Sequence, residues 1–228
     1  MDMYLDLFSS FGEIVSNTNI IFYLLAYVIG GIPFGLLLVR MLYKIDIRTI
    51  GSGSIGATNV YRAIKELNPQ VAKTLAICTI ILDACKGMII VALAKAFGLS
   101  FSVQWSIALL SILGHCYSPF LGFKGGKGVA TAIGSVILLI PIEGIFGLLV
   151  WGVVGKVFKI SSLSSLLGVF SGIALTFVLP YVLPLPDSIN ILTQVGTHTP
   201  VVLIGLLILY THIPNIKKLL SKQESKVL

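Results

Sequence analysis

The stretch TLAICTIILDACKGMIIVALA, residues 74–94, is almost wholly apolar, and Asp83 and Lys86 are its only charged residues. A helix of about 20 such residues spans the hydrocarbon core of a bilayer. A charge at that depth is costly unless it is paired or functional, and residues three apart share one face of a helix. The stretch therefore predicts a transmembrane helix in which Asp83 and Lys86 form an ion pair toward the protein interior. A catalytic role for the pair is the alternative.

Six further apolar segments lie outward from this one, at residues 20–43, 101–121, 129–141, 144–158, 163–184 and 199–220. The 228-residue chain is 56% hydrophobic and only 11% charged, whereas soluble domains carry about 25% charged residues. The fourth and fifth segments are interpreted as two short helices joined by a tight turn, with one kinked or re-entrant element as the alternative. The sequence thus predicts an all-α membrane protein with seven transmembrane helices in one domain, residues 1–228, of which residues 1–19 form an N-terminal extension.

The positions of lysine and arginine predict the orientation of the helices, because cytoplasmic loops are enriched in both. With the N-terminus outside, the inner loops and the C-terminal tail hold 14 of the 16 Lys and Arg residues. Lys95 falls outside, and Glu143 and Asp187 are expected in outer loops. Seven spans with the C-terminus in the cytoplasm satisfy this bias. The basic residues are spread between apolar stretches, so the net charge of +7 does not indicate nucleic-acid binding.

The first inner loop contains GSGSIGATNVYR, residues 51–62. Its glycines let the backbone turn tightly and direct several N–H groups at one point, which suits a phosphate group. Arg62 adds a planar fork of donors for phosphate oxygens. An ordinary flexible loop is the alternative.

The second inner loop contains GHCYSPFLGFKGGKGVAT, residues 114–131. Lys124 and Lys127 stand among glycines just before an expected helix N-terminus, which attracts anions. These lysines and glycines predict phosphate binding, although the Walker A pattern is absent. A basic loop that only sets the topology is the alternative. His115 is a candidate general base, or it holds this loop by a hydrogen bond.

A third block, YTHIPNIKKLL at residues 210–220, ends the last apolar segment. His212 and Asn215 are three apart and share a helical face, although Pro214 is expected to kink that helix. Taken alone, the block reads as a polar helix end in the headgroup region. No acidic residues cluster with histidines, so no metal is expected, and the three cysteines are interpreted as packing residues.

The blocks GSGSIGATNVYRA, GHCYSPFLGFKGGKGVATAIG and YTHIPNIKKLL, with DACKG at residues 83–87, resemble motifs of the bacterial acyl-phosphate:glycerol-3-phosphate acyltransferase family. The resemblance implies seven helices in the bacterial inner membrane with a cytoplasmic active site. It implies transfer of a fatty acyl group from acyl phosphate to the 1-hydroxyl of glycerol 3-phosphate, giving lysophosphatidate and phosphate in the first step of phospholipid synthesis. No cofactor and no obligate protein partner are expected, and the protein is expected to be a monomer.

The resemblance also implies roles for individual residues. Glycerol 3-phosphate would contact Ser52, Arg62, Lys124, His212 and Asn215. Acyl phosphate would lie against Gly51, Gly53, Gly56, Thr58, Gly125, Gly126, Lys127 and Gly128. The catalytic set would be Ser52, Asn59, His115 and Lys124. The sequence departs from the family pattern at Ser54, where asparagine is usual, and at Ile213 and Pro214, where charged residues are common.

The sequence holds no GxSxG elbow and no HxxxxD pair, so an acyl-enzyme intermediate is not expected. Direct attack by the glycerol hydroxyl is the hypothesis, with its proton passing to the substrate's own phosphate or to His115. A transporter for a phosphorylated metabolite is an alternative, but it would place polar sites near the bilayer midplane. A seven-helix receptor or scaffold is a third possibility, and it has no need of two glycine-rich basic loops.

Overall fold

The computed structural model describes residues 17–226, and all regular elements in that range are helices. Five lie in the first half of the chain, α2 (Thr18–Gly30), α3 (Phe34–Tyr43), α4 (Ala57–Ile64), α5 (Pro69–Ala96) and α6 (Phe101–Cys116). Six follow, α7 (Val129–Val136), α8 (Pro141–Phe158), α9 (Ser161–Thr176), α11 (Ile191–Val195), α12 (Thr199–Thr211) and α13 (Ile213–Leu220). Short turns complete the set, η1 (Ile47–Thr49), η2 (Pro119–Leu121), α10 (Leu179–Val182) and η3 (Asp187–Ile189).

The central helix is α5, which contains the apolar stretch 74–94 and extends it at both ends. Asn68 caps its start, because the side-chain oxygen accepts from the N–H groups of Gln70 and Val71, and proline occupies the first helical position. The predicted ion pair is confirmed: Lys86 Nζ lies 2.8 Å from Asp83 Oδ1, and both side chains are buried.

Two of the predicted segments form bent pairs of helices rather than straight ones. α2 and α3 meet at 41° across Pro33, and α12 and α13 meet at 61° at His212. The kink expected near Pro214 is confirmed, with Pro214 in the first turn of α13. The two helices expected at residues 129–141 and 144–158 are also separate, as α7 and α8.

Three helices are each long and apolar enough to cross a membrane, and the number reaches five when each bent pair counts as one span. α6 has 16 residues and α7 has 8, so both are shorter than a full crossing of about 20 residues. The seven-span count and the orientation therefore stay predictions. Residues 1–16 of the N-terminal extension lie outside the described residues. Glu143 does not stand in a loop as expected, because α8 begins at Pro141 and takes Glu143 into its first turn, where it is buried.

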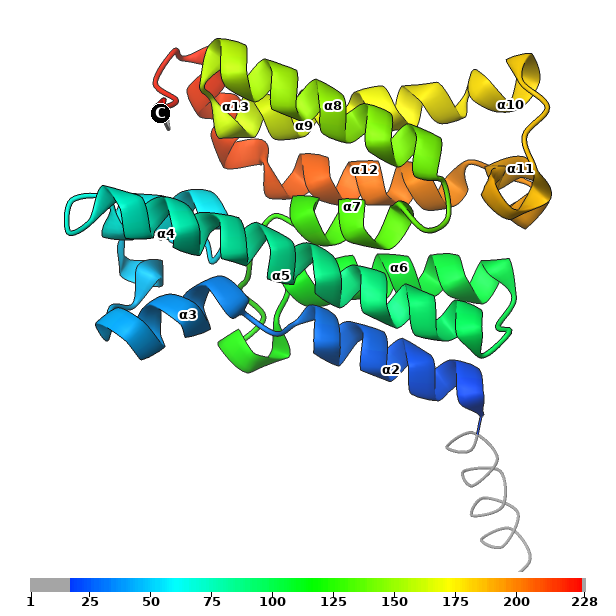
Figure 1. Cartoon of the computed structure of the whole chain (residues 1–228), viewed down its shortest axis with the longest axis horizontal. Coiled ribbons are helices and arrows are strands. Elements are labelled where there is room, and N and C mark those ends of the chain that lie inside the picture. Colours follow the sequence, from blue (N-terminus) through cyan, green and yellow to red (C-terminus); the bar gives the residue numbers. More distant parts are fainter. Residues whose placement is uncertain (1–16, 227–228) are drawn as a thin grey trace, which may run out of the picture.

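Figure 1 shows the helices in two groups, with α2, α3, α5 and α6 on one side of α7 and the α8–α9 hairpin with α12 on the other. Small residues let the helix backbones meet closely, as in membrane bundles generally. A Cβ at Gly30 would lie 2.1 Å from Ser111 O, and one at Gly147 would lie 2.7 Å from Gly168 O. α8 exposes Leu149, Val153 and Val157, and such apolar faces suit contact with lipid.

Candidate functional site

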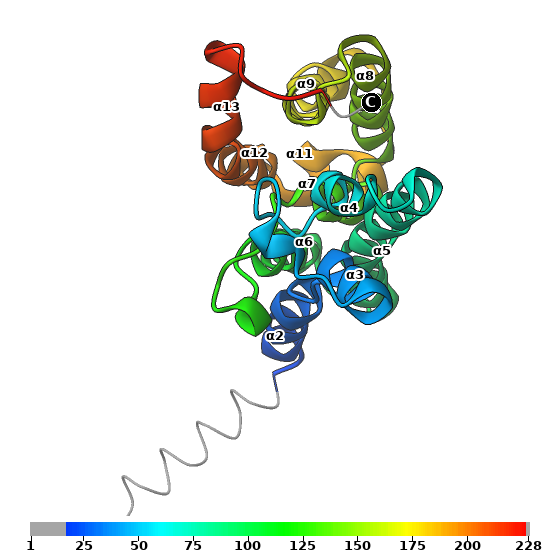
Figure 2. The ribbon, with the colours of Figure 1, turned by 90° about the vertical axis from the view of Figure 1, so that its left-hand side faces the viewer.

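A cavity of about 220 Å³ runs between the two groups of helices. Its polar end lies at loop 51–56, Arg62 and Lys127. Its apolar part continues along α7, α8, α9 and α12 and is lined by Ile133, Val136, Ile140, Leu148, Trp151 and Ile173, among others. Figure 2 views the bundle from the side of α4 and α13, with α8, α9 and α12 on one side of α7 and α4.

Four helices begin at the polar end. α4 starts at Ala57, α7 at Val129, α9 at Ser161 and α13 at Ile213, and the cap or first turn of each lines the cavity. The first N–H groups of a helix have no partner within the helix, and the helix dipole makes that end positive. Helix N-termini are therefore anion-binding sites, and here they converge with two cationic side chains.

Loop 51–56 is folded around the side chain of Asn59, which is 1% exposed. Asn59 Nδ2 donates to the carbonyl oxygens of Ile47, at 2.7 Å, and Ser54, at 2.8 Å, while Oδ1 accepts from the N–H of Ser52 at 3.1 Å. Gly51 has a φ of 57°, a conformation that glycine adopts readily. The sequence placed Asn59 in the catalytic set; the structure shows it holding the loop in shape.

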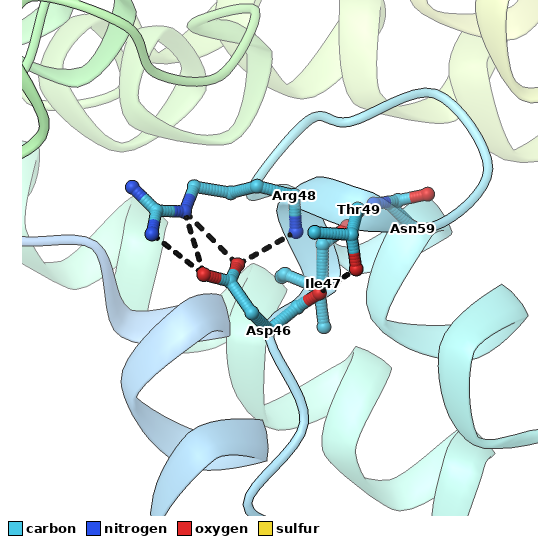
Figure 3. A network of polar contacts seen from close by, with 5 residues as sticks. All are labelled: Asp46, Ile47, Arg48, Thr49 and Asn59. Carbon is cyan, nitrogen blue, oxygen red and sulfur yellow. Dashed lines mark hydrogen bonds and ion pairs between the residues drawn. The ribbon is translucent and has the colours of Figure 1, made fainter.

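The turn before this loop is held by Asp46 and Arg48 (Figure 3). Asp46 accepts from the backbone N–H of Arg48 at 3.0 Å and forms an ion pair with the guanidinium at 2.6 Å. Thr49 Oγ1 donates to the carbonyl of Asp46 at 2.9 Å. The side-chain hydrogen bonds from Arg48 lower the pKa of Asp46 to about 2, so this exposed pair is charged at neutral pH.

The two lysines of the second loop point to different places. Lys127 lines the cavity, whereas Lys124 is exposed and lines a separate hollow with Arg48 and Gly125. The chain turns before Lys124 through the left-handed backbone of Phe123, φ 60°. The structure therefore does not bring Lys124 to Arg62, as the family resemblance implied, and places Lys127 there instead.

Lys127 is held close to α12, because its carbonyl accepts from Thr211 Oγ1 at 3.1 Å. Burial lowers the pKa of Lys127 to about 8; the nearby carboxylate of Glu224 opposes this shift, and the positive charges of Arg62 and Lys218 add to it. The ammonium form predominates at pH 7 but is lost under mildly alkaline conditions.

His212 and Asn215 both line the cavity and are both buried. His212 Nδ1 lies 2.8 Å from the carbonyl oxygen of Ile208. A carbonyl can only accept, so Nδ1 carries the proton, and Nε2 of the neutral ring is left as an acceptor. The bend beside Pro214 has not separated His212 from Asn215.

The C-terminal tail folds back to the same place. Arg62 Nη2 donates to Ser225 Oγ at 2.8 Å, and Asn215 Nδ2 donates to Glu224 Oε1 at 3.0 Å. Glu224 lines the cavity near Lys127. The polar end thus already holds one carboxylate of the protein itself, which is consistent with a site for an anion.

Beneath the polar end, Lys86 makes three contacts with its ammonium group. It lies 2.9 Å from the carbonyl oxygen of Ile32, 2.9 Å from His115 Nδ1 and 2.8 Å from Asp83 Oδ1. His115 is buried, and both His115 and Asp83 contribute to the cavity wall. The network joins the link between α2 and α3 to α5 and α6 under the second loop.

His115 also packs against the glycines of that loop. The N–H of Gly126 donates to the carbonyl of His115 at 3.0 Å, and a Cβ at Gly126 would lie 2.0 Å from His115 Nε2. At Gly125 a Cβ would lie 2.1 Å from the same carbonyl oxygen. The sequence offered two roles for His115, and this geometry matches the one in which it holds the loop.

The structure therefore brings together ten of the residues expected at the site: Ser52, Gly56, Thr58, Asn59, Arg62, His115, Lys127, Gly128, His212 and Asn215. It leaves five away from the cavity wall: Gly51, Gly53, Lys124, Gly125 and Gly126. Ser54, one of the departures from the family pattern, lines the cavity, and its Oγ accepts from the N–H of Gly56 at 3.4 Å.

Sequence reasoning missed Ser161, Ser162 and Glu224. Thr58 Oγ1 and Ser161 Oγ lie 2.8 Å apart, which joins α4 to α9, and Ser162 is a buried cavity residue. Two serines directly before an apolar segment are a typical helix start, and this signal could have found them. Nothing in the sequence around Glu224 indicates its return to the site.

Comparison with known proteins shows the family of the chain. A family model described as glycerol-3-phosphate acyltransferase matches residues 20–222. A protein named glycerol-3-phosphate acyltransferase from Helicobacter hepaticus is 68% identical over 94% of this chain and 96% of its own length. The protein of that name from Wolinella succinogenes is 49% identical over 93% of this chain and 98% of its own length.

Solved structures agree with this assignment. The glycerol 3-phosphate form of PlsY (YgiH), an integral membrane glycerol 3-phosphate acyltransferase, superposes with a TM-score of 0.76 at 33% identity, over 92% of this chain and 96% of that one. Its lysophosphatidic acid form gives a TM-score of 0.73 at 34% identity, over 92% and 95% of the two chains. The resemblance seen in the sequence motifs is confirmed, and the chain belongs to the glycerol-3-phosphate acyltransferase family of membrane enzymes.

Proposed function

We propose that this protein transfers a fatty acyl group from acyl phosphate to the 1-hydroxyl of glycerol 3-phosphate, giving lysophosphatidate and inorganic phosphate. One observation carries the proposal: the cavity joins a cationic end, where four helices begin, to a long apolar passage. That order of polarity matches a molecule with an anionic head and a fatty chain. The family description supports glycerol 3-phosphate as the acyl acceptor, and the lysophosphatidic acid form of PlsY supports lysophosphatidate as the product.

Glycerol 3-phosphate is assigned to the mouth of the cavity. Arg62 offers a fork of donors to its phosphate, and Lys127 adds a charge beside it. Asn215 Nδ2 and the hydroxyl of Ser52 are further donors along the same wall. His212 Nε2 accepts from a glycerol hydroxyl, because its other ring nitrogen is engaged with Ile208. Lys127 thus takes the place that the motif comparison gave to Lys124.

The phosphate of the acyl donor is assigned to the starts of α4 and α7, where Gly56, Thr58 and Gly128 line the cavity. Free N–H groups there are fixed before the substrate arrives, so they stabilise negative charge without reorganisation. The acyl chain then lies in the apolar passage between α7, α8, α9 and α12.

The reaction is one substitution at the acyl carbon. The oxygen of the glycerol 1-hydroxyl forms a bond to the carbonyl carbon, and the bond from that carbon to the phosphate oxygen breaks. Phosphate leaves with the electron pair, and the hydroxyl proton passes to a phosphate oxygen. Holding both substrates in one cavity removes much of the entropic barrier, which contributes several kcal/mol. Donors aimed at the developing oxyanion contribute roughly 3 kcal/mol more.

The contacts of His115 disfavour it as the base. Lys86 can donate hydrogen bonds but cannot accept them. His115 Nδ1, at 2.9 Å from Lys86 Nζ, must therefore be the acceptor, which leaves the ring proton on Nε2. A nitrogen that already carries a proton cannot remove another, so the substrate phosphate, with a second pKa of about 6, is the better acceptor.

The polar end is proposed to face the cytoplasm of a bacterium with the chain in its inner membrane, N-terminus outside and C-terminus inside. The ends of α3, α8 and α13 that meet at that end of the bundle (Figure 1) carry the basic residues Lys44, Lys156, Lys159 and Lys217. Lysine and arginine prefer the cytoplasmic side. The protein is proposed to act as a monomer with no cofactor.

Purified protein in liposomes, supplied with palmitoyl phosphate and glycerol 3-phosphate, tests the assignment. Release of phosphate that requires both substrates, together with formation of lysophosphatidate, is the expected result. Uptake of glycerol 3-phosphate into the liposomes without acylation would instead support the transporter alternative. Acylation from an acyl thioester but not from palmitoyl phosphate would overturn the proposed donor.

A further inference from the structure

Glu143 lies at the end of the cavity opposite the polar end, which is formed by loop 51–56, Arg62 and Lys127. It belongs to the first turn of α8, while the basic residues Lys156 and Lys159 mark the other end of that helix. Glu143 is 1% exposed and contributes to the cavity wall together with Ile140 and Thr176. α9 passes beside it so closely that a Cβ at Gly172 would lie 3.0 Å from the backbone oxygen of Glu143.

The carboxyl group of Glu143 has no hydrogen-bond partner for either oxygen among residues 17–226. An acidic residue in the first turn of a helix is common, because it interacts with the positive end of the helix dipole. Such residues usually reach water, whereas this one is buried at the end of an apolar passage. Burial of an unpartnered polar group is costly, so its presence there calls for an explanation beyond helix capping.

Beyond Glu143 the bundle is closed by a polar clamp. Gln194 of α11 donates to the carbonyl of Leu139 at 2.8 Å and accepts from Trp105 Nε1 at 2.8 Å. Trp105 and Leu139 are both buried. A chain that enters from the polar end of the cavity therefore meets Glu143, Thr176 and Ile140 in the part of the cavity wall that lies near this clamp.

The length of the passage corresponds to a fatty chain. The cavity is lined by α9 from Ser161 to Thr176, a distance of roughly 22 Å at 1.5 Å per residue. A zigzag hydrocarbon advances roughly 1.3 Å per carbon, given a C–C bond near 1.52 Å. A chain of about 17 carbons would therefore bring its methyl end to the level of Thr176, one helical turn beyond the contact of Gly172 with the backbone of Glu143.

We propose that Glu143 is the residue that sets the upper limit of acyl-chain length, and this inference rests on the proposed function. Its side chain fills the end of the passage, and its backbone cannot move back because α9 is in contact there. A longer chain would have to displace the side chain, or else leave its last carbons outside the passage. Shortening the side chain at this position opens room for added methylene groups.

The test compares kcat/KM for acyl phosphates of twelve to twenty carbons in four proteins: the wild type, Glu143→Ala, Glu143→Asp and Glu143→Gln. The wild type is expected to fall sharply beyond about eighteen carbons. Burial of each added methylene is worth about fourfold, so Glu143→Ala should raise the ratio of the twenty-carbon to the sixteen-carbon substrate by roughly tenfold or more. Glu143→Asp should raise it by about fourfold, and Glu143→Gln, which keeps the volume, should leave it unchanged.

Val153→Ala is the matched control, because Val153 lies on the same helix but is 63% exposed on its outer face. An unchanged length profile in active Ala and Asp variants would overturn the proposal. So would a shift in Glu143→Gln as large as that in Glu143→Ala, because volume would then not be the cause. If Glu143→Ala does not fold, Glu143→Asp decides. A wild type that uses no acyl phosphate of any length would refute the proposed donor, which is a different failure.

Discussion

Lys86 Nζ lies 2.9 Å from His115 Nδ1, and this contact determines which ring nitrogen of the histidine carries the proton. An ammonium group only donates, so Nδ1 accepts, and the ring of His115 presents an N–H at Nε2. The same ring touches the backbone of Gly126. The histidine is thus placed to support the second loop, and the geometry offers it no lone pair for catalysis.

We therefore expect His115→Gln to keep kcat within about tenfold of the wild type at saturating substrates. Loss of a general base costs roughly 100- to 10,000-fold. The glutamine oxygen can still accept from Lys86, and folding can be checked by circular dichroism. A fall in kcat beyond about a hundredfold, with both Michaelis constants unchanged, would show that His115 is the base. It would also exclude the substrate phosphate as the only proton acceptor.

Arg62→Lys is expected to raise the KM for glycerol 3-phosphate by roughly ten- to a hundredfold, because a hydrogen bond to a charged group is worth about 1.5–3 kcal/mol. An ammonium cannot reproduce the paired donors of a guanidinium. Arg48→Lys is the matched control, since Arg48 pairs with Asp46 at 2.6 Å and lines the separate hollow. Equal effects of the two substitutions on KM would contradict the placement of the substrate at Arg62.

Gly126→Ala is expected to lower activity by more than tenfold and to lower the melting temperature, because the added Cβ would lie 2.0 Å from His115 Nε2. Gly152→Ala serves as the control, since no heavy atom lies within 4 Å of a Cβ there and alanine favours a helix. Both variants are measured by thermal unfolding in detergent and by acyl transfer. Full activity of Gly126→Ala would show that the loop can move away from His115.

Features that depend on neighbours in the chain could be predicted from the sequence. The Asp83–Lys86 pair follows from a spacing of three on one helix, and the bend near Pro214 follows from the missing donor of proline. The third partner of the pair, His115, could not be predicted, because it lies on a different helix and meets Lys86 only when α5 and α6 pack.

The sequence also could not show which of the two lysines in the second loop lines the cavity. Lys124 and Lys127 have the same chemistry and similar glycine neighbours, so local pattern does not separate them. They are separated by backbone conformation, with Phe123 left-handed before Lys124 and Gly128 left-handed after Lys127. The number of spans was predicted from the apolar segments and from the distribution of Lys and Arg, and neither signal can foresee that α7 stops after 8 residues.

The depressed pKa of Lys127 predicts how substrate binding depends on pH. The free site loses its ammonium charge as the pH rises through about 8, and only the charged form attracts phosphate. The KM for glycerol 3-phosphate should therefore be flat up to about pH 7, roughly double by pH 8, and then rise toward tenfold per pH unit. Lys127→Arg should flatten this rise, because arginine stays charged throughout this pH range. Lys124→Arg, at the exposed lysine, should leave the rise as it is; the reverse result would assign the phosphate to Lys124.

The carboxylate of Glu224 is expected to compete with glycerol 3-phosphate for hydrogen-bond donors at the site. It lies beyond residues 20–222, the part that matches the family, yet its Oε1 accepts from Asn215 at 3.0 Å. Glycerol 3-phosphate must displace this carboxylate from the donors that it needs itself. Removing the charge should therefore favour the substrate, and Glu224→Gln is expected to lower the KM for glycerol 3-phosphate about two- to tenfold, because a hydrogen bond to a neutral acceptor is weaker by about 1 kcal/mol than one to a charged acceptor.

Removal of residues 223–228 should lower that KM to a similar extent, because Ser225, which accepts from Arg62 at 2.8 Å, leaves with Glu224. Glu66→Gln is the matched control: Glu66 is an exposed carboxylate that pairs only loosely with Lys65, at 3.5 Å, and its loss should not change the KM. A higher KM in Glu224→Gln would reverse the assignment, since it would mean that the carboxylate accepts a hydrogen bond from the glycerol hydroxyls and helps to bind the substrate.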